Sequence, residues 1–187
     1  MVVTGPSGAG KGTLIRTLVR RRPDLEVAVS ATTRDRRDTE MEGRDYYFLT
    51  DEEFTKRVDA GDFLEHVVFV SGHRYGTLRS EIERILDAGR GCILELETAG
   101  ARRVKELRPE SVTIFVSPPS FKELERRLRQ RATETMGEID ERLAKAREQA
   151  EEKDAFDHVV VNDDVERAVD ELETIVDSVA GAAPTRR

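Results

Sequence analysis

The sequence predicts an α/β fold in which a parallel sheet is flanked by helices. Short runs of β-branched and other apolar residues alternate with longer amphipathic stretches, a pattern typical of parallel α/β sheets. A glycine-rich segment, residues 5–13, separates the first apolar run from the first amphipathic stretch, which is where this fold class carries a phosphate-binding loop. The 187 residues suffice for one domain of ordinary size, or for one core with small insertions.

Five short runs rich in β-branched residues are expected to form the strands of the parallel sheet. They are residues 2–3, 27–29, 92–96, 112–116 and 158–161. Amphipathic periodicity predicts helices over residues 11–22, 51–60, 79–88, 99–106, 120–131, 138–153 and 165–179. Two of these helices begin with the pattern of a capping box, Thr50 with Glu53 and Ser120 with Glu123.

Two stretches do not fit the plain alternation. Residues 30–77, hereafter the insertion, are rich in charged and aromatic residues and contain the strand-like runs 46–49 and 63–70. We interpret them as a small, mostly β, substrate-binding unit over the carboxyl ends of the core strands. Residues 120–147, hereafter the lid, form two arginine-rich helices interrupted near residues 133–137, which indicates a mobile flap. The core then comprises residues 1–29, 78–119 and 148–187.

Composition excludes some classes of partner. The chain has 38 acidic and 31 basic residues and a net charge of −7, so no overall positive field would hold it to nucleic acid or to an anionic membrane. It also lacks an aromatic platform for stacking bases. A single cysteine, no apolar run near the length of about 18 residues that spans a membrane, and no signal-peptide pattern predict a cytoplasmic protein. Monomer and homodimer both remain open.

Arginine accounts for 25 of the 31 basic residues. Its planar guanidinium binds phosphate through two parallel hydrogen bonds, so the excess fits phosphate chemistry. Codon usage would produce the same excess, and composition leaves both explanations open.

The glycine-rich segment has the residue types of a phosphate-binding loop. Its main-chain N–H groups can surround a phosphate, while the following helix contributes a favourable dipole at its N-terminus. A nucleotide is expected to contact Gly5, Pro6, Ser7, Gly8, Ala9, Gly10, Lys11, Gly12 and Thr13, with Lys11 at the β- and γ-phosphates. A glycine-rich turn that binds nothing is the alternative, and the combination of three glycines, Lys11 and Thr13 in this context disfavours it.

The segment Ser30 to Phe48, SATTRDRRDTEMEGRDYYF, together with the phosphate loop, closely resembles guanylate kinase. Matching segments follow in the family's order at residues 63–66, 74–77, 131–134 and 161–164. The resemblance implies the fold of nucleoside monophosphate kinases, with a core, a GMP-binding insertion and a lid. It also implies reversible, magnesium-dependent transfer of the γ-phosphoryl group of ATP to GMP, and to dGMP, giving ADP and GDP.

By resemblance, Arg34, Arg37, Tyr46 and Tyr75 hold the phosphate of GMP. Two guanidinium groups suit a dianion, and two phenols can donate to its remaining oxygens. The alternative is a solvated charged loop beside two core tyrosines, which the four donors at the family's spacing disfavour.

The resemblance assigns recognition of the base to Ser30, Glu65 and Thr77. A carboxylate can accept from both N1–H and the 2-amino group of guanine, whereas adenine has an acceptor at N1 and no 2-amino group. A buried carboxylate left unpaired by the wrong base would make discrimination strong. A glutamate in a strand also often faces solvent, and spacing alone does not decide between the two.

Two glutamates end the run 92–96 where the family usually has Asp-x-Asp followed by Gln-Gly. Glu95 is expected to orient the Mg²⁺ shell through water, and Glu97 to approach the base or ribose of GMP. Pairing of either glutamate with an arginine remains an alternative. Gly12 stands where the phosphate-loop pattern has Ser or Thr, and the expected magnesium contact, direct or through water, moves to the next residue, Thr13.

The lid is expected to supply catalytic arginines. By resemblance, Arg127, Arg131 and Arg142 join Lys11 in offsetting the charge that develops on the transferring phosphoryl group. Asn162 resembles the residue that contacts the adenine of ATP, and an N-cap of the last helix is the equal alternative for it.

No side-chain general base is needed, because the attacking phosphate of GMP is already ionised; the three histidines also lack the spacing of a metal site. Two other functions compete with this interpretation. One is an inactive guanylate-kinase-like scaffold that binds phosphopeptides, which the presence of Lys11 and the lid arginines disfavours. The other is a related phosphate-loop kinase acting on a sugar phosphate, which the expected base pocket disfavours.

Overall fold

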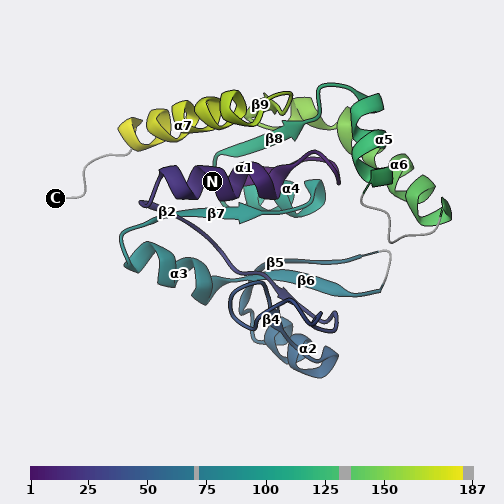
Figure 1. Cartoon of the computed structure of the whole chain (residues 1–187). Coiled ribbons are helices and arrows are strands. Elements are labelled where there is room, and N and C mark those ends of the chain that lie inside the picture. Colours follow the sequence, from purple (N-terminus) through teal and green to yellow (C-terminus); the bar gives the residue numbers. More distant parts are fainter. Residues whose placement is uncertain (70–71, 131–135, 183–187) are drawn as a thin grey trace.

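The computed structural model describes residues 1–69, 72–130 and 136–182, and within them a five-stranded parallel sheet forms the centre of the fold (Figure 1). Its strands are β1 (Val2–Thr4), β2 (Leu25–Val27), β7 (Gly91–Glu95), β8 (Thr113–Ser117) and β9 (His158–Val161), and they follow the order β2-β7-β1-β8-β9. All of their pairings are parallel. The predicted α/β class is confirmed.

Helices cover both faces of this sheet because successive strand residues point to opposite sides. Val3 packs with apolar residues of α1 (Lys11–Arg21) and α7 (Val165–Ala182) on one face. Val2 packs with those of α3 (Arg79–Asp87) and α4 (Thr98–Leu107) on the other. The carboxyl ends of the strands therefore remain open to the phosphate loop and to ligands.

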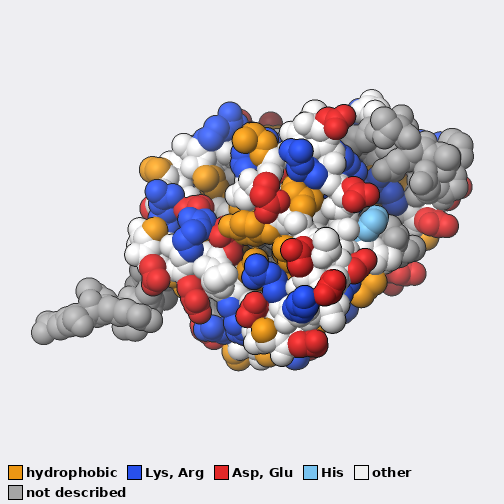
Figure 2. All heavy atoms as spheres, turned by 90° about the horizontal axis from the view of Figure 1, so that it is seen from below, with side chains coloured by type: hydrophobic (Ala, Val, Ile, Leu, Met, Phe, Trp, Pro, Cys, Tyr) orange, Lys and Arg blue, Asp and Glu red, His pale blue; other side chains and the backbone are white. Residues whose placement is uncertain are grey.

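The insertion forms a second sheet of its own. Within the described part of the chain, its strands are β3 (Ala31–Thr32), β4 (Tyr47–Phe48), β5 (Phe63–Val68) and β6 (Arg74–Leu78), in the order β4-β3-β6-β5, and α2 (Asp51–Asp59) packs against them. Phe54 and Phe63 are stacked in the small core of this unit, with ring centroids 4.4 Å apart. Figure 2, which views the molecule from the insertion side, shows acidic and basic side chains intermixed on this face.

The described parts of the lid are α5 (Phe121–Gln130) and α6 (Met136–Glu151), which pack on each other through a third apolar cluster, formed by Leu124, Leu128, Leu143 and Ala146. A short 3-10 turn, η1 (Lys153–Ala155), leads from α6 to β9. Among the helices of the described ranges, none combines the length and the apolar character needed to cross a membrane.

Several local predictions differ from the structure. Strand β2 ends at Val27, two residues before the predicted end, because the main-chain N–H of Val29 donates to the Glu81 carboxylate, 3.1 Å away, instead of to a neighbouring strand. Strands β3 and β6 were not predicted, because β3 has two residues and β6 contains Arg74 and Gly76, which are atypical of strands. The other elements agree to within a few residues at their ends.

The two capping boxes have different outcomes. At α2, Thr50 and Glu53 exchange both expected bonds: the Glu53 N–H donates to Thr50 Oγ1 at 3.2 Å, and the Thr50 N–H donates to Glu53 Oε2 at 2.8 Å. At α5, the Glu123 N–H donates to Ser120 Oγ, but the Glu123 carboxylate accepts from Arg126 and Arg127. The carboxylate expected to complete the cap thus binds arginines of the lid.

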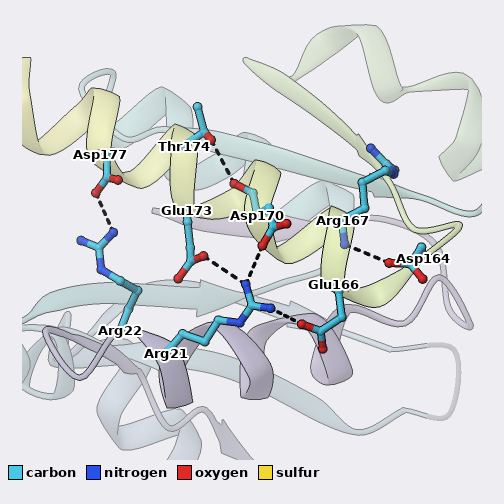
Figure 3. A network of polar contacts seen from close by, with 9 residues as sticks. All are labelled: Arg21, Arg22, Asp164, Glu166, Arg167, Asp170, Glu173, Thr174 and Asp177. Atoms are coloured by element: carbon cyan, nitrogen blue, oxygen red, sulfur yellow. Dashed lines mark hydrogen bonds and ion pairs between the residues drawn. The ribbon is translucent and has the colours of Figure 1, made fainter.

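An ionic cluster joins the C-terminal end of α1 to α7 (Figure 3). Arg21 contacts three carboxylates of α7: Glu166, Asp170 at 2.6 Å and Glu173 at 3.1 Å. Next to it, Arg22 bridges Asp24 and Asp177, at 2.8 and 2.6 Å. These contacts continue, at the surface, the apolar packing of α1 against α7.

Candidate active site

The phosphate loop lies between β1 and α1, with its three glycines Gly5, Gly8 and Gly10 at positive φ. Two observations explain why residue 10 is a glycine: its φ is 93°, and a Cβ there would lie 2.3 Å from Nδ2 of Asn162. The ammonium group of Lys11 donates to the carbonyl oxygens of Gly5 at 2.7 Å and Pro6 at 3.1 Å. The lysine is thus folded over the loop, where it would meet a bound phosphate.

A cavity of about 480 Å³ lies between the phosphate loop and the insertion. The core contributes Ser7, Lys11, Glu95 and Glu97 to its lining, and the insertion contributes Ser30, Tyr46, Glu65 and Tyr75. Eight residues predicted from the sequence therefore meet around one space. Thr77 also belongs to this group, because its hydroxyl donates to Glu65.

Glu65 is a buried carboxylate at the wall of this cavity, with 4 % of its surface exposed. Thr77 Oγ1 donates to Glu65 Oε1 at 2.7 Å, from the neighbouring strand β6. Burial raises the pKa of the Glu65 carboxyl, and the hydrogen bonds from Thr77 oppose that shift. The group lies at the wall of the cavity, where it can accept hydrogen bonds from a ligand.

Arg34 and the two tyrosines lie together on the insertion. The guanidinium carbon of Arg34 lies 5.4 Å from the ring centroid of Tyr46, whose ring meets that of Tyr75 edge-on at 5.9 Å. Arg34 also pairs with Glu40 at 2.7 Å, and this contact raises the pKa of the arginine and lowers that of Glu40. Arg37 is exposed, and its main-chain N–H donates to Glu40. Neither Arg34 nor Arg37 is among the described residues that line the cavity.

The two glutamates at the end of β7 have different surroundings. The carboxylate oxygens of Glu95 lie 3.7 and 3.9 Å from the position that a Cβ on Gly12 would take, beside the phosphate loop. Glu97 Oε2 accepts from Lys145 Nζ of the lid at 2.6 Å. The alternative of pairing with a basic residue is thus realised for Glu97, with a lysine in place of the arginine considered.

A second, smaller hollow of about 270 Å³ opens beside the phosphate loop, and Gly8, Gly10, Thr13, Arg127 and Asn162 are among the residues that line it. Thr13 therefore faces this hollow, whereas Glu95 lines the larger cavity. The Thr13 hydroxyl oxygen accepts from Arg16 at 3.3 Å.

Arg127 and Asn162 both bind the phosphate loop, although each is more than 100 residues away from it in the sequence. Arg127 donates to the carbonyl oxygens of Ala9 at 3.3 Å and Asn162 at 3.1 Å. The Asn162 amide, which is buried, donates to Ala9 O at 2.7 Å. The cap of α7 is Asp164, whose Oδ1 accepts from the Arg167 N–H at 2.9 Å. Asn162 therefore does not serve as the helix cap considered as its alternative.

The remaining lid arginines are Arg131 and Arg142. Arg142 donates to Ser7 Oγ at 2.6 Å, which brings its guanidinium to the phosphate loop. Arg131 lies outside the described residues. Lys11, Arg127 and Arg142 thus gather around the same loop.

The prediction from sequence missed several contributors to the larger cavity, and two of them contact predicted site residues. Gly100, near the start of α4, lines the cavity, and a Cβ there would lie 3.0 Å from Glu65 Oε2. A glycine inside an amphipathic helix is unfavourable, so its presence was the available signal. Phe69 also lines the cavity and packs on Tyr75, with ring centroids 4.6 Å apart; the strand pattern alone gave no sign of this role.

The pattern of these residues fits the comparisons with known proteins. Residues 1–179 match the family model described as guanylate kinase. A guanylate kinase of Prochlorococcus marinus (strain MIT 9313) is 47 % identical over 175 residues, which cover 94 % of this chain and 92 % of the relative. One from Rubrobacter xylanophilus (strain DSM 9941 / JCM 11954 / NBRC 16129 / PRD-1) is 49 % identical over 185 residues, covering 98 % and 96 %.

A solved structure gives the same result at the level of the fold. The crystal structure of guanylate kinase from Anaplasma phagocytophilum superposes with a TM-score of 0.76 at 32 % identity, covering 95 % of this chain and 83 % of the other. With the phosphate loop, the cavity and these matches over nearly its whole length, the chain belongs to the guanylate kinase family.

Proposed function

We propose that this protein is an ATP:GMP phosphotransferase, which reversibly transfers the γ-phosphoryl group of ATP to GMP, and to dGMP, with Mg²⁺, giving ADP and GDP. One observation carries the proposal: the buried carboxylate Glu65 and the phosphate-loop lysine Lys11 line the same cavity. A group suited to a guanine base and a group suited to the phosphates of a second nucleotide therefore border one space. Membership of the guanylate kinase family supports this interpretation.

Base selection is assigned to Glu65, with Ser30 and Thr77. Thr77 already donates to Oε1 of Glu65, so the carboxylate is held in place while its remaining lone pairs can accept from N1–H and the 2-amino group of guanine. Adenine offers neither donor in this arrangement. Each hydrogen bond to a charged group is worth about 1.5–3 kcal/mol, and an unpaired buried carboxylate costs more still.

The phosphate of GMP is assigned to Arg34, Arg37, Tyr46 and Tyr75. Tyr46 and Tyr75 line the insertion side of the cavity, and Arg34 lies against the ring of Tyr46, where its pair with Glu40 orients the guanidinium. Arg37 reaches the phosphate through rotation of its exposed side chain. Bidentate contact from two guanidinium groups offsets the dianion.

For the transfer step, the chain supplies positioning and positive charge. Lys11, Arg127 and Arg142 surround the phosphate loop and offset charge that develops on the transferring group. We assign Arg131 to the same role by its place in the lid. Asn162 holds the loop through Ala9 and lines the hollow where we place the adenine of ATP. The attacking phosphate needs no general base, because it is already ionised.

The donor set beside the loop fits a magnesium ion that arrives with ATP. In the described part of the chain, no group of three or more His, Cys, Asp or Glu side chains could hold a metal by itself. Mg²⁺ in kinases is usually held by one or two protein oxygens together with waters and substrate phosphates. We assign to it Glu95, from the larger cavity, and Thr13, from the smaller hollow on the other side of the phosphate loop, each directly or through water, and the ion would neutralise phosphate charge.

The proposal is tested by a coupled assay of ADP formation with AMP, GMP, dGMP, CMP, UMP and a ribose phosphate as acceptors. Turnover with GMP and dGMP, and little with the others, is expected. Turnover of the sugar phosphate in place of GMP would support the related-kinase alternative. No turnover of any acceptor, with binding of a phosphopeptide, would support the scaffold alternative.

A further inference from the structure

One lysine of the lid contacts both of the other parts of the molecule. Lys145, on α6, donates to Glu97 Oε2 of the core at 2.6 Å. The same ammonium lies 4.8 Å from the ring centroid of Phe69, the residue that directly follows strand β5 of the insertion. Figure 1 shows the lid helices and the β5–β6 hairpin at the same end of the molecule. Core, insertion and lid therefore meet at Lys145.

Lys145 belongs to a face of α6 that is directed at the site. Arg142, three residues earlier, donates to Ser7 Oγ of the phosphate loop at 2.6 Å. Gln149, four residues later and 5 % exposed, has its Nε2 3.5 Å from Glu97 Oε2. Residues three and four apart lie on one side of a helix. This side of α6 thus contacts the phosphate loop and the end of the GMP cavity together.

Both partners of Lys145 line the larger cavity. Glu97 presents a carboxylate to it, and Phe69 packs on Tyr75, one of the residues assigned to the phosphate of GMP. Without a nearby cation, the Glu97 charge would repel an anionic ligand and its side chain could adopt other rotamers. With Lys145 in place, the charge is offset and one carboxylate oxygen is held.

We propose that Lys145 is a positioning residue that couples the lid to the GMP site, an inference that rests on the proposed function because GMP is the ligand taken to occupy this cavity. When α6 lies against the core, Lys145 fixes Glu97 and supports Phe69; when α6 moves away, both contacts are lost. A nucleotide that holds the lid through Arg127 and Arg142 therefore raises the affinity for GMP. By linkage, GMP raises the affinity for that nucleotide by the same factor.

The two side chains of the ion pair are 38 % and 30 % exposed, so the pair contributes little to global stability. Its effect is expected in the coupling between ligands. The variant Lys145→Met keeps the length of the side chain and removes its charge. Lys122→Met makes the same change at an exposed lysine of α5 and serves as the control. Lys145→Arg, which keeps the charge, should restore part of the function.

The experiment measures GMP binding to the full chain by calorimetry, with and without a non-hydrolysable ATP analogue and Mg²⁺. In the wild type and in Lys122→Met, the analogue is expected to tighten GMP binding by about 5-fold or more. In Lys145→Met, this ratio should fall close to one, the KM for GMP should rise and the thermal midpoint should stay near that of the wild type. A wild-type ratio in Lys145→Met would overturn the inference.

A double-mutant cycle with Glu97→Gln identifies the route of the effect. If Lys145 acts through Glu97, the double variant should show a GMP KM no higher than that of the more affected single variant. Independent, multiplicative effects would contradict action through Glu97. A wild-type chain that neither binds nor phosphorylates GMP overturns the proposed function as well, whereas GMP turnover with intact coupling in Lys145→Met overturns only the inference about Lys145.

Discussion

Glu65 shows how the surroundings of a single side chain give it a function. It follows two buried apolar residues of β5, Phe63 and Leu64, one hydroxyl holds it, and the missing side chain of Gly100 leaves room for its second oxygen. The sequence made Glu65 a candidate only through resemblance, because alternation along a strand does not reveal which way an isolated glutamate faces. Its burial is a product of the tertiary fold.

Replacing this carboxylate by an amide should weaken the choice of base. Glu65→Gln keeps the size of the side chain and one acceptor but loses the charge. We expect the ratio of kcat/KM for GMP to that for AMP to fall by about 10- to 100-fold, the equivalent of about one hydrogen bond to a charged group. The measurement is the coupled assay with both acceptors. An unchanged ratio would remove Glu65 from the base pocket.

The pH dependence of GMP use should also report on Glu65. Because burial raises its pKa in the folded state, the contribution of this group to stability is present at low pH and is lost as pH rises through the folded pKa. GMP binding has the opposite requirement, since it needs the ionised carboxylate. The kcat/KM for GMP should therefore fall on acidification at a pH above the ordinary range of glutamate.

A comparison of pH profiles separates this effect from titration of the substrate. The phosphate of GMP itself titrates near a pH of about 6 and affects every variant alike. Only the fall in kcat/KM that is caused by protonation of Glu65 should be absent from the pH profile of Glu65→Gln. Superimposable profiles for wild type and variant would show that Glu65 does not control binding in this pH range.

Lys11 should affect transfer much more than GMP binding. Its ammonium lies over the phosphate loop on Gly5 and Pro6, and Lys11→Ala is expected to lower kcat by about 1000-fold, as loss of a transition-state donor does. The Kd of GMP should change by less than about twofold, because the base and phosphate groups of GMP are assigned to other residues. Lys153→Ala, at an exposed position, is the control. Loss of GMP binding would contradict the assigned role.

At the scale of elements, the sequence predicted the regular parts well and the irregular sheet of the insertion poorly. The phosphate loop, α1 and the core strands have strong local signals: three glycines, apolar runs and helical periodicity. Strands β3 and β6 are held by pairing with distant segments, as in the Ala31–Gly76 and Glu65–Thr77 registers, which local composition does not contain. For the same reason, the contact of Lys145 with Glu97 could not be read from spacing.

The junction between core and insertion depends on Glu81 of α3. This buried carboxylate accepts from the Val29 N–H and the Tyr47 hydroxyl, both at 3.1 Å, and from Arg84 at 2.9 Å. The arginine contact and the two other donors lower the pKa of Glu81 against the effect of burial. One residue thus ties the end of the core strand β2 to the edge strand β4 of the insertion.

Removing this acceptor should destabilise the fold. Glu81→Ala leaves partly or fully buried donors unsatisfied and is expected to reduce the free energy of unfolding by about 2–3 kcal/mol. Urea denaturation followed by circular dichroism measures the loss. The control is Glu83→Ala, an equal change of charge at an exposed position of the same helix. Equal effects of the two substitutions would show that the buried contacts of Glu81 contribute nothing specific.

At the scale of the whole molecule, a net charge of −7 does not conflict with binding two anionic nucleotides. The positive groups Lys11, Arg127 and Arg142 are gathered at one loop, while many other arginines are paired with carboxylates on the surface. The arginine excess thus has one part at the site and a larger part in ion pairs. The composition gives the number of arginines, and only the fold shows which of them lie at the site and which form ion pairs.

The ionic cluster between α1 and α7 should make stability depend on salt. Arg21→Ala removes contacts to three carboxylates of α7 and should lower the thermal midpoint at low ionic strength. The difference from the wild type should shrink in about 1 M NaCl, because salt screens exposed charges. Arg20→Ala, on the same helix and bonded to Thr17, is the control. A salt-independent difference would point to lost packing of the arginine stem instead.

The bond from Asn162 to Ala9 joins positions 153 residues apart in the sequence. A ribosome releases the residues of the phosphate loop long before those that brace it, since β1 also needs β8 at its side and β8 needs β9. A nascent chain that stops short of residue 162 therefore holds every glycine of the loop without the amide that anchors it. The growing protein therefore completes its nucleotide site only after residue 162 has left the ribosome.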